Sequence, residues 1–228
     1  SVRHVFYRMT NPRLPQPVEK TDAGYNQVQY QITRMRRDGA VPYGWIADAT
    51  RRGYHVDTFG SRAEFIRRVT GLYRADLWSM AHVYVEVWCE SRSIAGVIED
   101  ECEELAVSLY PCGGFSSITL AFDGAQTINR RTHNGSLPAE ILFIGDYDPA
   151  GVLIDKSLEN ELRKHIHPRV DLTFRRLAIT PEQIHEFDLP TKPRKAGDKR
   201  ALHVLETVEA EAMPAGILRQ MLRDCIES

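Results

Sequence analysis

Apolar side chains recur at helical spacing in the N-terminal part of the chain. The clearest pattern predicts an amphipathic helix over residues 25–38, which Gly39 ends. Its apolar positions are three or four residues apart: Tyr25, Val28, Ile32 and Met35. Residues 2–9 predict a shorter helix before it.

A third helix is expected over residues 61–73, where Ser61 and Glu64 form a capping box. Its apolar residues form a stripe that we expect to be buried: Phe65, Ile66, Val69 and Leu72. Residues 41–46, which precede it, indicate a turn and a short strand.

Three segments farther along the chain predict strands: residues 82–89, 141–144 and 170–177. The segment at 141–144 is a short apolar run, long enough for a buried strand. A helix is expected over 91–110, after the first strand, and another over 117–131. The chain ends in an amphipathic helix.

Two acidic residues follow the strand at 141–144. Gly145 ends that strand, and Asp146 and Asp148 precede Pro149, which suits a first helical position because it has no N–H. Open α/β sheets bind ligands at the carboxyl ends of their strands. Two carboxylates this close repel each other unless a cation lies between them, and Mg²⁺ prefers such hard oxygen ligands. The alternative is that both acids are turn residues that cap the next helix.

Composition narrows the class of protein. The 228 residues suffice for one large or two small domains, and 43% hydrophobic with 26% charged residues is ordinary for a soluble protein. No apolar run approaches a membrane span, and no signal peptide is visible. The four cysteines lack C-x-x-C spacing, which argues against a zinc site or a disulfide framework and fits a reducing cytoplasm.

The net charge of −2 does not by itself indicate a nucleic-acid-binding protein. Basic residues nevertheless gather locally, and a local basic face binds phosphates whatever the total charge. We expect DNA contacts from the helix at 25–38, from the segment after it and from the Pro-rich loop at 189–195. The candidates are Arg34, Arg36, Arg37, Arg51, Lys192, Arg194 and Lys195. A solvated surface is the alternative for each of them.

The stretch from Ala139 to Ile154 resembles the Asp-x-Asp motif of Toprim domains, which occur in topoisomerases, bacterial primases and some nucleases. Its Pro-x-Gly extension is most similar to the DNA-cleaving, A-type chain of topoisomerase VI and the related meiotic recombination protein. Two other segments carry the same resemblance. Residues 3–7 resemble the Arg-x-x-aromatic-Tyr segment of the family's winged-helix domain, and residues 112–117 resemble its Gly-aromatic-x-Ser loop.

The resemblance implies an α/β fold in two domains. An N-terminal winged-helix (helix-turn-helix) domain would span 1–78, and a Toprim domain with a mainly parallel sheet would span 79–228. Glu90, at the end of the first strand, aligns with the Toprim glutamate, and Glu86 is its competitor within the strand. The implied Mg²⁺ ligands are Glu90, Asp146 and Asp148.

The resemblance also implies the activity: Mg²⁺-dependent cleavage of double-stranded DNA by tyrosyl transesterification. Tyr7 aligns with the nucleophile, and Arg3 would orient or neutralise the phosphate. In that family the tyrosine of one protomer works with the metal site of the other, so a homodimer in the cytoplasm, associated with the nucleoid, is expected. A separate B-type ATPase protein is the family's usual partner, and this chain contains no P-loop.

Alternatives to this activity stay open. Toprim domains also serve hydrolytic nucleases of plasmid or phage defence systems, in which no tyrosyl link forms. A DNA-binding module without cleavage is the rival from another class. Tyr7 itself could be a packed aromatic residue beside Phe6.

Overall fold

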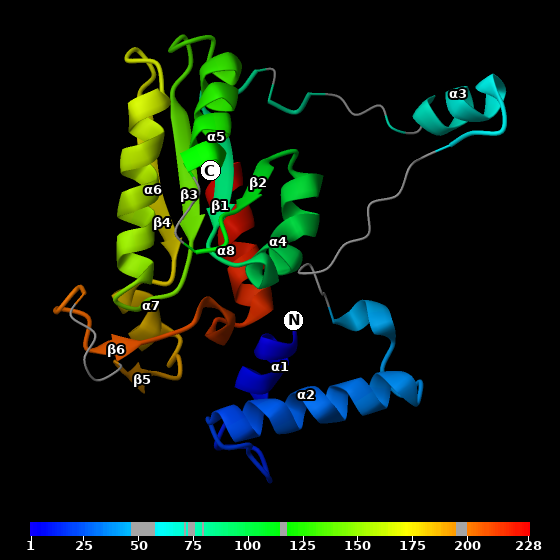
Figure 1. Cartoon of the computed structure of the whole chain (residues 1–228), viewed down its shortest axis with the longest axis vertical. Helices are drawn as coiled ribbons and strands as arrows, with labels where there is room; N and C mark the ends of the chain where they lie inside the picture. Colours follow the sequence, from blue (N-terminus) through cyan, green and yellow to red (C-terminus); the bar gives the residue numbers. More distant parts are fainter. Residues whose placement is uncertain (47–57, 71, 73–75, 79, 115–117, 195–199) are drawn as a thin grey trace.

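The chain is an α/β protein built around a four-stranded parallel sheet (Figure 1). The computed structural model contains eight α-helices within the residues that it describes. These residues are 1–46, 58–70, 72, 76–78, 80–114, 118–194 and 200–228.

The sheet brings two parts of the sequence to one edge. Its strands are β1 (Tyr84–Cys89), β2 (Ser108–Pro111), β3 (Ala139–Ile144) and β4 (Leu172–Ala178). All of its strand pairs are parallel, and the order is β2-β1-β3-β4. Because β1 and β3 are neighbours and end together, with Cys89 opposite Ile144, the residues that follow these two strands lie close together.

Helices cover both faces of the sheet. On one face lie α4 (Arg92–Glu104) and α8 (Ala215–Glu227). On the other lie α5 (Ile118–Arg131) and α6 (Gly151–His165) (Figure 1).

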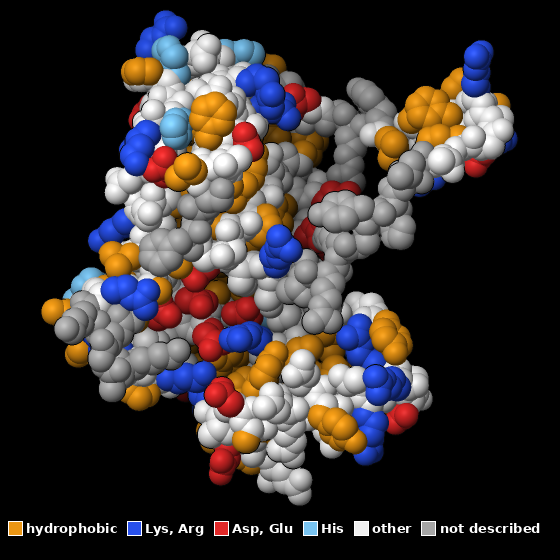
Figure 2. Space-filling view, in the orientation of Figure 1, with side chains coloured by type: hydrophobic (Ala, Val, Ile, Leu, Met, Phe, Trp, Pro, Cys, Tyr) orange, Lys and Arg blue, Asp and Glu red, His pale blue; other side chains and the backbone are white. Residues whose placement is uncertain are grey.

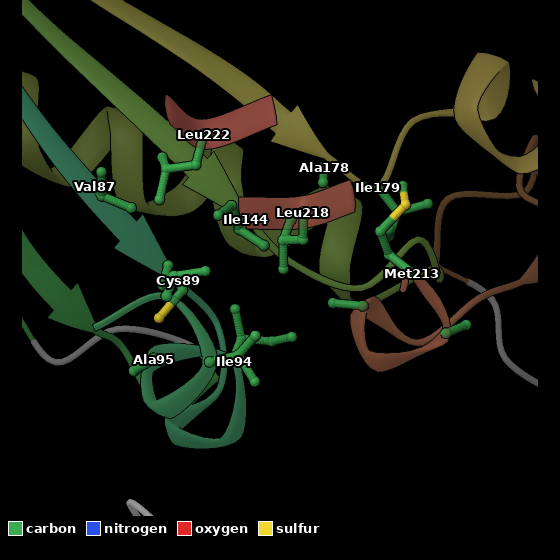
Figure 3. Packing of buried hydrophobic residues seen from close by; sticks show 14 of the residues in the cluster. Val87, Cys89, Ile94, Ala95, Ile144, Ala178, Ile179, Met213, Leu218 and Leu222 are labelled. Carbon is green, nitrogen blue, oxygen red and sulfur yellow. The ribbon is translucent and has the colours of Figure 1, made fainter. Parts of the chain in front are cut away.

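Alternation along the strands supplies each face with its own apolar side chains, because successive residues of a strand point to opposite sides. Val87 and Ile144 pack with Leu218 and Leu222 of α8 (Figure 3). Trp88, on the opposite side of β1, belongs to the core under α5 and α6.

The N-terminal helices are joined to this core. The first two are α1 (Val2–Met9) and α2 (Asp22–Arg37), which pack on each other. Phe6, Val28 and Ile32 are buried in the same apolar cluster as α8. α1 also packs against the short helix η2 (Ala210–Ala212), so its side chains meet the C-terminal part of the chain.

Two expected elements differ from those in the structure. Residues 41–46 contain the short helix η1 (Tyr43–Trp45) rather than a strand. No strand occurs before residue 79 in the part of the chain that the structure describes, so a winged-helix identity is not shown. The helix expected over 91–110 ends at Glu104, because Ala106 takes a left-handed conformation (φ 55°), and β2 follows.

The predicted burial of the third helix is wrong. α3 (Arg62–Thr70) has no buried residue, and Figure 1 shows it standing apart from the sheet. Its apolar stripe is exposed, with Ile66 at 60% and Leu72 at 69%. Helical periodicity shows that a stripe exists, but burial also requires a facing surface in the same chain.

The remaining elements follow β4. α7 (Pro181–Glu186) begins with a capping box, as its sequence indicates, in which Thr180 and Gln183 bond each other's backbone. β5 (Lys192–Pro193) and β6 (Glu206–Thr207) form a small antiparallel pair. Among the described helices, none has the length and apolar character needed to cross a membrane.

Candidate functional site

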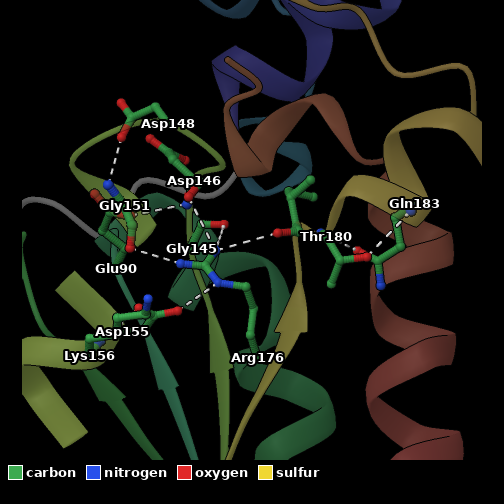
Figure 4. Close-up of polar contacts among 11 residues, drawn as sticks. Glu90, Gly145, Asp146, Asp148, Gly151, Asp155, Lys156, Arg176, Thr180 and Gln183 are labelled. Carbon is green, nitrogen blue, oxygen red and sulfur yellow. Dashed lines mark hydrogen bonds and ion pairs between the residues drawn. The ribbon is translucent and has the colours of Figure 1, made fainter. Parts of the chain in front are cut away.

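Glu90 and Asp146 lie side by side at the carboxyl ends of β1 and β3 (Figure 4). The Glu90 N–H continues the strand pairing by donating to the carbonyl of Ile144 at 2.8 Å. The Asp146 N–H in turn donates to Oε2 of Glu90 at 3.0 Å. The structure thus brings together two of the three predicted metal ligands, from adjacent parallel strands.

Two glycines permit the close approach of these acids. A Cβ on Gly145 would lie 2.7 Å from Cε1 of Phe143 and 3.0 Å from Oε2 of Glu90. A Cβ on Gly151 would lie 2.1 Å from the carbonyl oxygen of Asp146. A side chain at Gly145 would push against the Phe143 ring and the Glu90 carboxylate, and a side chain at Gly151 would collide with the backbone of the turn between β3 and α6.

Burial disfavours the charged forms of both acids. Desolvation raises the pKa of Asp146 to about 8, with the charge of Glu90 adding to the effect. Burial likewise raises the pKa of Glu90, although the N–H bond from Asp146 opposes the shift. Such a pair is stabilised in its charged form by a cation, which is the condition expected of a metal-binding pair.

Asp148 makes a different contact from the other two acids. Its Oδ1 accepts the N–H groups of Ala150 at 2.8 Å and of Gly151 at 2.6 Å, so it caps the first turn of α6. Within the described residues, no three His, Cys, Asp or Glu side chains are arranged to hold a metal ion. The helix-capping alternative therefore describes the observed contact of Asp148, and its role as a ligand stays a prediction.

Asp148→Asn separates the two roles, because asparagine keeps a cap acceptor and loses the charge. If Asp148 is a Mg²⁺ ligand, we expect DNA nicking to fall at least about tenfold while the thermal midpoint changes by only a few degrees, since a cap is worth about 1 kcal/mol. The assay is plasmid nicking at several Mg²⁺ concentrations. Unchanged nicking with an unchanged Mg²⁺ requirement would leave Asp148 as a cap alone.

Arg176 of β4 braces the turn that carries the acids, and the sequence patterns did not single it out. Its Nη1 donates to the carbonyls of Gly145 at 3.1 Å and Asp146 at 3.2 Å. Nη2 donates to Gly151 at 2.8 Å, and Nε pairs with Asp155 at 2.8 Å (Figure 4). The sequence offers no signal that separates Arg176 from its neighbour Arg175 in the same strand.

Glu211 of η2 is a second residue that sequence reasoning missed. Its side chain is buried, and Oε1 lies 3.4 Å from the Ser91 hydroxyl. Its negative charge contributes to the raised pKa values of Asp146 and Glu90. The neighbouring Ala210 N–H donates to Oδ1 of Asp146 at 2.8 Å, which attaches η2 to the acidic pair.

The predicted nucleophile and its arginine lie on the other side of η2. Arg3 forms an ion pair with Glu209, whose carboxylate is also the hydrogen-bond partner of the Tyr7 side chain. Tyr7 is buried, and burial raises the pKa of its hydroxyl above the ordinary value. Its ring centre lies 5.3 Å from that of Phe6, so the packing expected of a core aromatic residue is present.

The predicted DNA contacts fall into three groups. Arg34, Arg36 and Arg37 lie in the last turn of α2, where Arg36 donates to the Tyr43 carbonyl at 2.7 Å. Lys192 is close to Glu209, at 3.4 Å. Arg194 donates to backbone carbonyls of residues 200–204, whereas Arg51 and Lys195 lie outside the described residues. Arg36 and Arg194 therefore hold the protein's own backbone, and the DNA contacts of this set stay a prediction.

Glu86, the competitor of Glu90, is a core residue. It is 1% exposed and accepts hydrogen bonds from the Tyr84 hydroxyl and from Nε1 of Trp88, both at 2.8 Å. Burial raises the pKa of Glu86 to about 7, and these bonds oppose the shift. Its position inside β1, away from the strand end, favours Glu90 as the member of the acidic pair.

Glu86→Ala is expected to lower the free energy of unfolding by about 2–5 kcal/mol, because it leaves a cavity and removes the acceptor of the buried Trp88 Nε1 and of the partly buried Tyr84 hydroxyl. Glu86→Gln keeps acceptor capacity and should cost less. Urea denaturation of both variants measures the difference. Equal stability of the alanine variant and the wild type would contradict the buried hydrogen-bond network.

Comparison of the chain with protein-family models, with curated proteins and with solved structures gave no match. The family resemblance therefore depends on the sequence motifs alone.

Proposed function

We propose that this protein cleaves DNA strands in a Mg²⁺-dependent reaction like that of the DNA-cleaving, A-type chain of topoisomerase VI, with Tyr7 as the nucleophile. The observation that carries the proposal is the pairing of Glu90 and Asp146 at neighbouring strand ends, with η2 linking this pair to Tyr7. Paired acids with raised pKa values at a strand edge are a frequent feature of catalytic sites.

The donor set of the acidic pair fits Mg²⁺. Both groups are carboxylates, and Mg²⁺ typically takes one or two carboxylates together with waters and phosphate oxygens. Glu90 and Asp146 would hold the ion, and Asp148 is the predicted third ligand. When bound, the ion supplies positive charge that stabilises negative charge on a phosphate.

The protein's own residues supply the nucleophile and its orientation. The Tyr7 hydroxyl would lose its proton as its oxygen forms a bond to phosphorus. The bond from phosphorus to the 3′ oxygen would break, and the 3′ oxygen would take up one proton and leave as a hydroxyl, so that no net proton is gained or lost. Arg3 would hold the phosphate by charge-assisted hydrogen bonds. As in the family that the sequence resembles, the protein would act as a homodimer in which each tyrosine serves the acidic pair of the other protomer.

A second function is favoured by the burial of Tyr7. Its side chain is 7% exposed and is bonded to Glu209, as in a structural residue. Under this alternative the acidic pair belongs to a Toprim nuclease in which water attacks the phosphate. The products then carry free 5′ phosphates and no attached protein.

A single assay separates the candidates. Supercoiled plasmid is incubated with the protein and Mg²⁺, the mixture is denatured, and DNA-linked protein is measured. The proposal expects Mg²⁺-dependent breaks with protein covalently bound to 5′ ends. Breaks without attached protein indicate hydrolysis, and DNA binding without breaks at any Mg²⁺ concentration would rule out both cleavage functions.

A further inference from the structure

Three basic side chains from separate parts of the chain converge beside Tyr7. Arg3 comes from α1, Lys20 from the segment before α2, and Lys192 from β5. Arg3 and Lys192 both pair with the carboxylate of Glu209. Nζ of Lys20 lies 5.4 Å from the centre of the Tyr7 ring. Figure 2 shows basic side chains beside acidic ones in the region between α1 and the sheet.

Lys20 is held in place by the backbone rather than by an acidic side chain. Its Nζ donates to the carbonyls of Pro190 at 2.6 Å and Thr191 at 3.1 Å, which uses two of its three N–H groups. Partial burial lowers the pKa of Lys20 to about 8, and the charge of Lys192 adds to this effect. An additional anion at this position would therefore stabilise the charged lysine.

We propose that Arg3, Lys20 and Lys192 form a binding site for one DNA phosphodiester next to the Tyr7 hydroxyl, and that Glu209 occupies this site until DNA displaces it. A carboxylate and a phosphodiester accept the same charge-assisted hydrogen bonds from arginine and lysine. The Glu209 side chain is 29% exposed, so it can turn toward solvent without leaving a buried cavity.

The charges at this position favour a ligand over a purely structural ion pair. Fastening α1 to the C-terminal segment requires only Arg3 and Glu209, but Lys192 also pairs with that one carboxylate, and Lys20 is near enough to interact with its charge. Glu211, the other nearby acid, is buried and lies beside Ser91. The tyrosine hydroxyl already bonds the anion that occupies the site, and in the proposed complex that anion would be the phosphate to be attacked.

The inference rests on the proposed DNA function, but it can be measured without cleavage. A short fluorescent duplex is titrated with the full chain in EDTA at several salt concentrations. Glu209→Gln should bind about three- to tenfold more tightly, because the competing charge is removed. Lys20→Met should bind more weakly and reduce the slope of log affinity against log salt by about one.

Matched variants control for the general effect of charge. Glu206→Gln removes an exposed acid three residues before Glu209, and Lys164→Met removes an exposed lysine of α6. We expect both to bind DNA as the wild type does. Thermal denaturation reports whether each variant is folded. If Glu209→Gln does not fold, the slope of log affinity against log salt for Lys20→Met tests the phosphodiester site by itself.

The binding and cleavage results separate a failure of the phosphodiester site from a failure of the proposed cleavage function. If Glu209→Gln matches Glu206→Gln and Lys20→Met matches Lys164→Met, the phosphodiester site is overturned, whether or not the wild type cleaves DNA. If both variants shift affinity as expected while the wild type never cleaves, the site is supported and the cleavage function is lost.

Discussion

Tyr7→Phe is expected to abolish DNA cleavage and every covalent protein–DNA adduct. The change removes only the hydroxyl that would attack the phosphate and keeps the ring that packs beside Phe6. Losing the bond to Glu209 should reduce the free energy of unfolding by about 0.5–1.5 kcal/mol, too little to unfold a typical domain. The measurements are plasmid nicking, adduct formation after denaturation, and urea denaturation.

Tyr30→Phe is the matched control, because Tyr30 is an exposed tyrosine of α2. It should cleave as the wild type does. Nearly normal cleavage by Tyr7→Phe, with free 5′ phosphates, would transfer the role of nucleophile to water. Duplex binding by Tyr7→Phe should stay close to that of the wild type, since the charges of Arg3, Lys20 and Lys192 are untouched.

Asp146→Asn is expected to lower Mg²⁺-dependent cleavage by at least about a hundredfold, because it removes one charge of the pair that would hold the ion. Asparagine retains an oxygen that can accept the Ala210 N–H, so the attachment of η2 is kept. Asp123→Asn, at an exposed position of α5, is the control. A wild-type rate for Asp146→Asn would show that the acidic pair does not hold the metal.

The same variant should change how stability depends on pH. The fold raises the pKa of Asp146 from its ordinary 3.8 to about 8, so it favours the protonated acid. This contribution to stability is complete below pH ~4 and is lost as pH rises through about 8. Without metal, the wild-type thermal midpoint should therefore fall between about pH 5 and pH 8.5, and Asp146→Asn should flatten the decline.

Two other acids should cause the fall of the thermal midpoint with pH that remains in Asp146→Asn. The pKa of Glu86 is raised to about 7, and that of Glu90 is also raised, so both act in the same direction as Asp146. Mg²⁺ binds the charged acids and should raise the wild-type midpoint at high pH more than that of Asp146→Asn. Identical pH profiles for the two proteins would contradict the burial assigned to Asp146.

The local sequence pattern was sufficient to predict those elements that depend on interactions between neighbouring residues. The apolar run at 141–144 followed by glycine, two acids and proline predicted the strand, the turn and the helix of the site, and each is present. The sequence alone places the acids at a strand end, because both signals are local. Hydrophobic periodicity marks the strand, and glycine and proline mark the turn, each within a few residues. The same reasoning placed Glu90 after β1.

Tertiary structure decided which of these residues meet. Asp146 contacts Glu90 from 56 residues away and Ala210 from 64 residues away, and no periodicity encodes such pairings. The burial of Glu211 and the bracing by Arg176 depend on η2 and β4 folding back over the turn.

The tertiary structure also gave the two aspartates different hydrogen-bond partners, which the sequence could not distinguish. Asp148 is directed to the N–H groups of α6, while Asp146, two residues earlier, faces Glu90 and η2. The exposed stripe of α3 shows the converse, since its pattern was that of a buried helix and the described chain supplies no surface to cover it. Sequence therefore determined the local elements of the site and their chemistry, whereas contacts between distant segments determined the burial of Glu90 and Asp146, which raises the pKa of both.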